Sequence, residues 1–303
     1  MNAGVVGDDT TNDAVSRIVC ALAAANERIV LMVGDLGWSV VEPFAERFPT
    51  RFFNAGVAEQ NMTGMAAGLA SEGFHVFSYS IANFPTFRCA EQLRNDVAYH
   101  GLPVTVVSVG GGLAYGALGY SHHAVQDYAL LRTLPGMRIA APGCPMEVRA
   151  CLRHLVLNPG PSYLRLGKAG EPAQHTAPPL LESGRWLPIK SGHGRRALLA
   201  TGAALAAALE WQARSDHADC AVYSLPLWGM DAKGLQVEQI AAFDEVTALE
   251  DHLSDGGFGS WLLEAASGAG LAGRVRLRGL DAQVCGEVGS QATLNRLGGL
   301  TPT

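Results

Sequence analysis

The stretch ERIVLMVGDLGWS, residues 27–39, holds a continuous run of apolar residues that ends at Gly34 and Asp35. A strand with one face in water alternates apolar and polar residues, whereas a strand buried on both faces is apolar throughout. Strands of the second kind occur in parallel sheets that helices cover on either side. The run therefore predicts a buried parallel strand over residues 29–33 of an α/β protein.

Strand-like and helix-like segments alternate along the chain on both sides of this run. Short apolar runs predict further strands over residues 75–79, 104–109, 137–140 and 162–166. Helical periodicity and flanking Gly or Pro residues predict helices over residues 13–25, 64–69, 86–100, 128–134 and 146–157. Strands that alternate with helices in this way are typical of an open α/β sheet.

A proline-rich segment divides the chain into two parts. Residues 170–188 contain four prolines and show little periodicity, which is typical of a linker. The alternation then resumes, with strands expected over residues 197–200, 221–225, 246–250 and 275–277 and helices over residues 205–213 and 260–266. We therefore predict two open α/β domains, residues 1–170 and 185–303, joined by a linker over residues 171–184.

The composition limits the classes of function. The 303 residues are 48% hydrophobic and carry a net charge of −6, which disfavours a protein that binds nucleic acid or an anionic membrane. The longest weakly polar stretch, residues 197–209, is shorter than the roughly 20 residues that a membrane-spanning helix needs. The first residues, MNAGVVGDDTTND, lack the basic start and apolar core of a signal peptide. We expect a cytoplasmic protein.

The six cysteines are scattered singly through the chain. None forms a Cys-x-x-Cys pair, and none stands at a zinc-like spacing from a histidine. Isolated cysteines of a cytosolic protein usually behave as small buried hydrophobic residues. We therefore expect no metal site formed by this chain alone.

Glu59 is the only acidic residue between Glu46 and Glu72, and small apolar residues surround it in the sequence. Such neighbours indicate burial, and a buried carboxylate is costly unless a partner pairs with it or shares a proton with it. Two interpretations follow from the residues. Glu59 is either the acidic first residue of a helix, satisfied by backbone amides, or a functional acid.

Seven motifs in the same order along the chain resemble one enzyme family. They are VGDLGWS (33–39), RFFNAGVAEQNMTGMAAGLA (51–70), NFPTFRCAEQLRND (83–96), GYSHHAVQDYALLRTLPGM (119–137), GPSYLRLGK (160–168), LLATG (198–202) and ALEDHLSDGGFGS (248–260). Together they resemble the C-terminal half of a transketolase, in the form that is encoded as a separate subunit. The resemblance covers nearly the whole chain.

The resemblance implies a fold and a cofactor. The first domain would be the pyrimidine-binding domain of a thiamine-diphosphate enzyme, and the second would be a transketolase C-terminal domain. In the family, thiamine diphosphate lies between the pyrimidine-binding domain and a diphosphate-binding domain of another subunit. Gly34 and Asp35 begin like the Gly-Asp-Gly…Asn signature for Mg²⁺ and diphosphate, but Leu36 follows. The diphosphate and Mg²⁺ would therefore be held mainly by a partner, an N-terminal transketolase subunit, in an α2β2 heterotetramer.

The resemblance also assigns roles to residues around the cofactor. Glu59 matches the glutamate that hydrogen-bonds a ring nitrogen of the cofactor pyrimidine and so promotes its activation. A carboxyl group in an apolar pocket can share a proton in this way near neutral pH. Phe84 and Phe87 lie in the segment that supplies the aromatic wall of the pyrimidine pocket. Arg88, which follows them, is interpreted as structural.

Four further residues match positions that face the substrate. His122 matches the family histidine beside the thiazolium ring, where it would move a proton to or from a substrate oxygen. His123 follows it on the same Gly-rich loop. Ser39 matches a serine that binds the substrate phosphate, and Lys168 stands where the family has an arginine.

Other phosphate and sugar ligands of the family are replaced. The second arginine position falls on Asn12, a histidine position falls on Gly110, and an acidic position that reads a sugar hydroxyl falls on Leu118. Loss of arginine removes both charge and bidentate geometry. We therefore expect a substrate other than a standard sugar phosphate.

The leading interpretation is a subunit of a thiamine-diphosphate carboligase that transfers a two-carbon ketol or acyl unit from a ketone donor to an aldehyde-type acceptor, in specialised metabolism. One alternative is the beta subunit of a 2-oxoacid dehydrogenase or of an acyloin-forming carboligase. Others are a non-catalytic assembly subunit and a free-standing α/β binding protein. The last is disfavoured because the apolar, Gly-rich stretch over residues 56–70 needs a covering partner.

Overall fold

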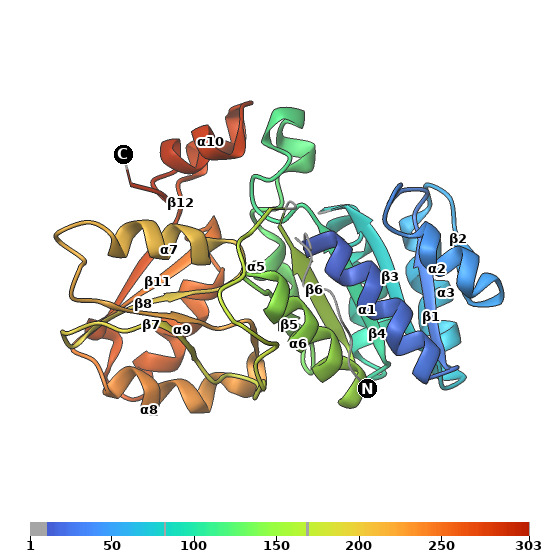
Figure 1. Ribbon diagram of the computed structural model, residues 1–303, viewed down its shortest axis with the longest axis horizontal. Coiled ribbons are helices and arrows are strands. Elements are labelled where there is room, and N and C mark those ends of the chain that lie inside the picture. The colour runs from blue at the N-terminus through green and yellow to red at the C-terminus, as the bar shows by residue number, and fades with distance from the viewer. Residues whose placement is uncertain (1–10, 82, 168–169, 303) are drawn as a thin grey trace.

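The computed structural model describes residues 11–81, 83–167 and 170–302. Within them the chain forms two sheets that lie side by side, each with helices on its faces (Figure 1). The larger sheet has seven strands and the smaller has five. The structure confirms the expected α/β class.

The first sheet is parallel except at one edge. Its strands in spatial order are β10 (Leu227–Gly229), β5 (Arg138–Ala140), β6 (Ser162–Leu166), β4 (Val104–Val109), β3 (His75–Ile81), β1 (Ile29–Val33) and β2 (Phe52–Asn54). The strands β1, β4 and β6 begin and end where the sequence predicts. The edge strand β10 was not predicted. It pairs antiparallel with β5 and comes from the chain beyond the linker, so the predicted domain boundaries stay a prediction.

Helices cover both faces of the first sheet, which explains the apolar pattern of β1. Val30 and Met32 pack toward one face, while Ile29, Leu31 and Val33 pack toward the other. All five are buried, and burial of each such side chain stabilises the fold by about 1.5–3 kcal/mol. The first face is covered by α3 (Glu59–Ser71), α5 (Asp127–Leu131) and the helical segment 87–98, and the second by α1 (Thr11–Ala25), α2 (Glu42–Arg47) and α6 (Pro145–Leu157).

The segment predicted as one helix over residues 86–100 forms in three pieces. A 3₁₀ turn over Phe87–Cys89 leads into one α-helical turn, α4 (Ala90–Gln92), and then into a π-helical stretch over Leu93–Ala98. The prediction of a helix is confirmed over residues 87–98, but the helix type changes twice, because over so short a stretch the apolar spacing fits several helix types. The 3₁₀ turn contains Phe87 and Arg88, so the change of helix type lies at the predicted pyrimidine pocket.

The second sheet has the spatial order β12 (Val275–Leu280), β11 (Glu245–Leu253), β8 (Arg196–Ala200), β9 (Ala221–Ser224) and β7 (Leu187–Lys190), and only β7 runs antiparallel to its neighbour. One face packs against α7 (Ala204–Gln212) and α10 (Gln291–Leu297), and the other against α8 (Gln236–Ala241) and α9 (Phe258–Ser267). We call residues 187–302, which contain this sheet and its helices, the C-terminal half.

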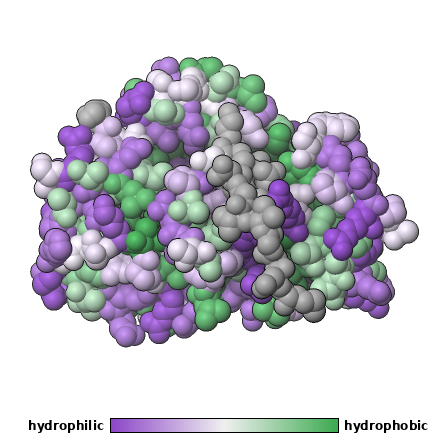
Figure 2. Space-filling model, viewed as in Figure 1, coloured by the Kyte–Doolittle hydropathy of each residue, from purple (hydrophilic) through white to green (hydrophobic). Residues whose placement is uncertain are grey.

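The surface shown in Figure 2 mixes hydrophilic and hydrophobic residues. None of the helices in the described ranges combines the length and apolarity that crossing a membrane requires.

Candidate active site

Three predicted site residues follow three parallel strands of the first sheet that are consecutive in the chain. Glu59 comes after β2, Phe84 after β3, and His122 after β4. The carboxyl ends of parallel strands meet at one edge of a sheet, which is where open α/β sheets bind ligands. The topology therefore places all three residues at the same edge.

Glu59 is the first residue of α3 and is only 2% exposed. Its Oε2 accepts a hydrogen bond from Nη1 of Arg88 at 2.7 Å, while the Arg88 side chain is 45% exposed. A buried carboxylate is tolerated when a cation pairs with it in this way. The partner of Glu59 is thus a side chain from the neighbouring loop, and Arg88, which was interpreted as structural, lies in the site.

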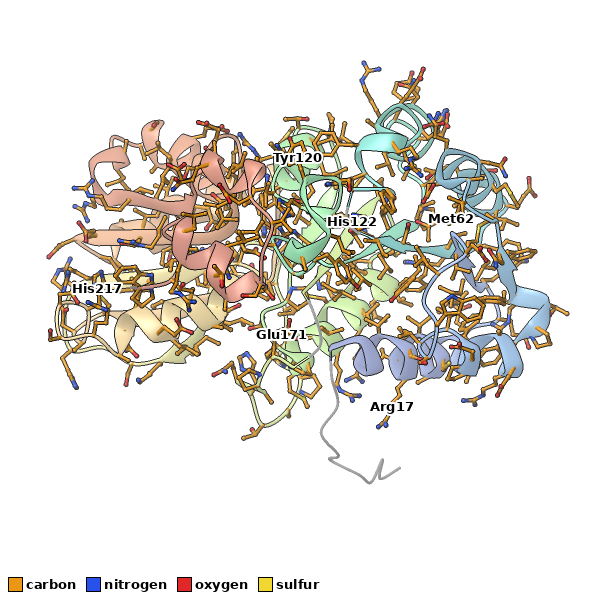
Figure 3. The ribbon with its side chains drawn as sticks, turned by 90° about the horizontal axis from the view of Figure 1, so that it is seen from above. Arg17, Met62, Tyr120, His122, Glu171 and His217 are labelled. Carbon is orange, nitrogen blue, oxygen red and sulfur yellow. The ribbon has the colours of Figure 1, made fainter. Side chains whose placement is uncertain are left out.

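The same guanidinium joins Glu59 to the other site residues. Its carbon lies 4.7 Å from the ring centre of Phe84, and the Phe84 ring makes an edge contact with His122 at 5.4 Å between ring centres. We call Glu59, Arg88, Phe84 and His122 the active-site row. His122 is half-buried, and its Nδ1 lies 3.0 Å from the hydroxyl of Ser121. Figure 3 shows its side chain on the segment between β4 and α5.

His123 is fully buried, whereas its neighbour His122 is half-buried. Its Nε2 lies 3.3 Å from the carbonyl oxygen of Gly116, and its carbonyl oxygen accepts a hydrogen bond from Nδ2 of Asn83 at 2.7 Å. Asn83 immediately precedes Phe84, so this bond holds the histidine segment against the aromatic segment. Asn83 begins the quoted motif NFPTFRCAEQLRND, but nothing in the sequence indicates this contact. The role of His123 toward substrate stays a prediction.

The remaining predicted residues lie around the row. Phe87 is 47% exposed, and its part in the pyrimidine wall stays a prediction. Ser39 is exposed on the loop after β1 and lines a surface hollow with Arg17 and Arg47 from α1 and α2. No residue of the active-site row lines that hollow. Lys168 lies outside the described residues.

Gly110, which the sequence resemblance is expected to place on a histidine position of the family, has no room for a side chain. Its φ is +89°, and a Cβ atom there would overlap the ring of Tyr115. The ring of Tyr115 therefore fills the space next to the carboxyl end of β4. Burial raises the pKa of the Tyr115 hydroxyl and that of Tyr79, so both present neutral phenols at neutral pH.

The row fits a flat, nitrogen-containing ring. A buried carboxyl group can bond a ring nitrogen, and an aromatic side chain can pack on a ring face. Two buried polar atoms next to the row, Oδ1 of Asn83 and Nδ1 of His123, have no hydrogen-bond partner among the described residues. Buried polar atoms are normally paired, so an incoming polar group would satisfy them. The donor set suits the pyrimidine end of the cofactor that the sequence suggests.

One cluster outside the row has the composition of a metal site. The ligand atoms of Cys144, Glu147 and His175 lie within 4.8 Å of one another. The Glu147 carboxylate already accepts hydrogen bonds from the Gly143 amide at 2.7 Å and the Ser224 hydroxyl at 3.0 Å, and its other oxygen lies 3.1 Å from Nε2 of His175. These bonds account for the cluster as a contact between α6 and the linker.

Comparisons with known proteins agree on one family. The family model of the transketolase pyrimidine-binding domain matches residues 9–171. The chain is similar to one of the subunits of the apulose-4-phosphate transketolase of Phocaeicola vulgatus, with 41% identity over 50% of this chain and 49% of that protein. It is also similar to a putative transketolase C-terminal section of Methanocaldococcus jannaschii, with 33% identity over 81% of this chain and 78% of that protein.

A solved structure extends the similarity to the whole fold. A split-gene transketolase, described as an inactive beta4 tetramer, superposes with a TM-score of 0.84 at 32% identity and covers 97% of this chain and 95% of its own.

Proposed function

The chain belongs to the transketolase family, and we propose on that premise that it is the C-terminal subunit of a split transketolase that uses thiamine diphosphate. The complete enzyme transfers a two-carbon ketol or acyl unit from a ketone donor to an aldehyde-type acceptor. The observation that carries the proposal is the active-site row at the carboxyl edge of the first sheet, in which a nearly inaccessible carboxyl group, an aromatic ring and a histidine come from three separate segments.

Thiamine diphosphate, when bound, would supply the carbon nucleophile for transfer of the two-carbon unit. The residues of this chain act around it. Glu59 holds a proton at a nitrogen of the pyrimidine ring, and Phe84 provides a flat apolar surface for that ring. His122 donates or accepts a proton at the substrate oxygen. The buried surroundings of Glu59 exclude water and strengthen these polar contacts.

A partner subunit completes the site in this proposal. Thiamine diphosphate carries most of its charge on the diphosphate, which Mg²⁺ and an aspartate-containing loop of the partner would hold. The surface near Glu59 suits a docked protein. Val57 is 75% exposed and Met65 is 42% exposed, while a Cβ at Gly64 or Gly68 would meet nothing within 4 Å. Exposed apolar side chains beside open glycines allow another backbone to approach closely. We propose an α2β2 assembly.

The substrate is proposed to differ from a standard sugar phosphate. Gly110 stands where the family has a histidine, and the ring of Tyr115 occupies the space beside it. The family acidic position is Leu118, whose apolar side chain is 59% exposed. The relative from P. vulgatus is named for apulose 4-phosphate, so the proposal concerns xylulose 5-phosphate and ribose 5-phosphate in particular rather than every phosphorylated sugar.

The test is reconstitution. The chain is purified alone and together with a candidate N-terminal transketolase subunit that carries Gly-Asp-Gly…Asn, and two-carbon transfer is assayed with ketose, 2-oxoacid and aldehyde panels. We expect transfer only with both proteins, thiamine diphosphate and Mg²⁺, and calorimetry should show weak cofactor binding, roughly millimolar, by the chain alone. Transfer by the chain alone, or reductive acylation of lipoamide as the only activity, would overturn the proposal.

A further inference from the structure

The segment that carries His122 is a loop whose two ends are hydrogen-bonded to each other, and we call this junction the neck. It leaves β4 at Val109 and reaches α5 at Asp127. Gly112 and Ala124 bond each other at the neck in both directions, each amide donating to the other's carbonyl oxygen at 2.9 Å. We call residues 110–126 the histidine loop. The position of His122 against Phe84 therefore depends on what holds this neck.

A buried arginine holds the neck from β6. Arg165 is 3% exposed, and each of its five N–H groups has an acceptor, as a guanidinium allows. Nη2 donates to the carbonyl oxygen of Ala124 at 2.7 Å. The other bonds are Nε to Oδ2 of Asp127 at 2.7 Å, Nη1 to Oδ1 of Asp251 at 2.6 Å, Nη1 to the Tyr128 hydroxyl at 3.2 Å, and Nη2 to the carbonyl oxygen of Asp251 at 3.1 Å.

Two of those five bonds end on Asp251, which belongs to β11 in the C-terminal half. Asp251 also touches the neck directly. Gly112 has a φ of +65°, and a Cβ there would overlap Oδ2 of Asp251. The neck backbone thus packs on this carboxylate, and a glycine is required because no side chain would fit.

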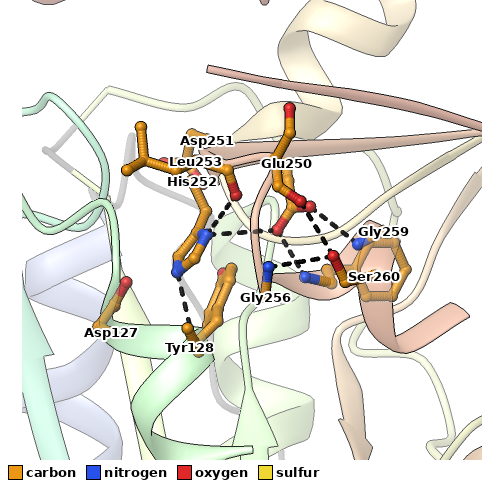
Figure 4. Close-up of polar contacts among 12 residues, drawn as sticks. Asp127, Tyr128, Glu250, Asp251, His252, Leu253, Gly256, Gly259 and Ser260 are labelled. Atoms are coloured by element: carbon orange, nitrogen blue, oxygen red, sulfur yellow. Dashed lines mark hydrogen bonds and ion pairs between the residues drawn. The ribbon is translucent and has the colours of Figure 1, made fainter. Parts of the chain in front are cut away.

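Other residues of the C-terminal half hold the same loop. The amide of Leu253 donates to the carbonyl oxygen of Val125 at 2.9 Å, and the amide of Gly289 donates to that of Gly116 at 3.3 Å. His252 accepts a hydrogen bond from the Ala129 amide at 3.3 Å through Nε2 and stacks on Tyr128 (Figure 4). The loop and the start of α5 therefore rest on β11 and the segment before α10, whereas His122 faces Phe84.

We propose that Asp251 is a positioning residue, which acts through Arg165 to fix the histidine loop so that His122 faces the cofactor and substrate. The C-terminal half is then part of the catalytic apparatus although none of its residues belongs to the active-site row. A buried arginine between two carboxylates is costly unless its geometry is maintained, so removal of one carboxylate charge loosens the neck. The catalytic part of this inference rests on the proposed function, whereas the effect on the loop does not.

The test compares Asp251→Asn with Glu264→Gln. Asn keeps the size of Asp251 and an oxygen that can accept from Nη1 but removes the charge. Glu264, on α9, forms a second ion pair between the two halves of the chain, with Arg132. Among the described residues its side chain bonds Arg132 and Lys233, neither of which belongs to the histidine loop. It therefore controls for weakened contact between the halves.

The first readout uses the full chain alone and needs no activity. We expect Asp251→Asn to speed amide hydrogen exchange in peptides covering residues 110–126 by about tenfold or more, with Glu264→Gln unchanged there. The second uses the reconstituted complex, in which Asp251→Asn should lower kcat about tenfold with KM for thiamine diphosphate within about twofold. Unchanged exchange in the loop, or equal losses of kcat in both variants, would overturn the proposal. If wild-type complex shows no transfer at all, the proposed function fails while the exchange result still decides the positioning role.

Discussion

Nη1 of Arg88 lies 2.7 Å from Oε2 of Glu59, and the same guanidinium lies over the ring of Phe84. One exposed arginine thus joins the carboxyl group at the start of α3 to the aromatic ring of the next loop. The contact provides the partner that a carboxylate with 2% exposure requires. It also holds Glu59 and Phe84 close together, and the proposed pyrimidine pocket needs both residues.

The first prediction concerns stability and follows from this contact. Arg88→Ala leaves the Glu59 carboxylate buried without its cation, and it should lower the free energy of unfolding by about 1–3 kcal/mol. Urea unfolding of the full chain measures this. Arg94→Ala is the matched control, because Arg94 is exposed on the same helical segment and its side chain hydrogen-bonds only the neighbouring Asn95 among the described residues. Equal losses for the two variants would show that the Glu59 contact contributes nothing.

The second prediction concerns activity. Glu59→Gln keeps the size of the side chain and an oxygen for Arg88 but removes the carboxyl group that would exchange a proton with the pyrimidine nitrogen, so kcat of the reconstituted complex should fall by roughly 100-fold to 10,000-fold. Glu72→Gln at the other end of α3 is the control, because Glu72 is exposed. Circular dichroism and thermal unfolding establish that both variants are folded. Activity retained by Glu59→Gln would favour the alternative of a non-catalytic assembly subunit.

The third prediction concerns pH. His75 lies on β3, its Nε2 is 2.9 Å from the Thr105 hydroxyl, and burial together with nearby Arg138 lowers the pKa of its imidazole to about 4. The unfolded chain titrates this group near 6.5. Between pH 4 and pH 6.5 the unfolded state binds a proton that the folded state does not bind. The contribution of His75 to the free energy of unfolding is therefore complete above about pH 6.5 and is lost as the pH falls toward 4.

The loss in the free energy of unfolding due to His75 should reach about 3 kcal/mol below pH 4. Denaturant unfolding between pH 4 and pH 7 measures it, with His75→Gln as the test variant and His100→Gln, at an exposed position, as the control. The difference between wild type and His75→Gln should shrink as the pH falls. A difference that stays constant across this range would contradict the assignment.

The parts of the fold that the sequence predicts well are those with a strong local pattern. The strand β1 is apolar throughout because helices cover both of its sides, and the pattern identifies it from end to end. The strand β10 has three residues and no periodicity, and its place is decided by pairing with β5. No local pattern carries that information.

The site shows the same limit. Glu59, Phe84 and His122 were found because motifs carry them, whereas the contacts of Arg88 and Asp251 join segments that are far apart in the chain. Asp251 stands in the quoted motif ALEDHLSDGGFGS, yet its partner Arg165 lies on another strand in the first sheet. A single sequence gives residue types and spacings. It does not give the tertiary contact that turns an exposed or unassigned charge into part of a site.

The last prediction concerns substrate choice and follows from the replaced phosphate ligands and from Tyr115. In the reconstituted complex, xylulose 5-phosphate with ribose 5-phosphate should react with a kcat/KM about 100-fold below that of the best pair in the panel. The absence of two charge-assisted contacts to phosphate at about 1.5 kcal/mol each corresponds to this factor. Tyr115→Ala opens the space beside Gly110 and should change the preference among acceptors of different length, while Tyr99→Ala, at a side chain that is 82% exposed, should not. Efficient turnover of both pentose phosphates by the wild-type complex would contradict the proposal that the substrate differs from a standard sugar phosphate.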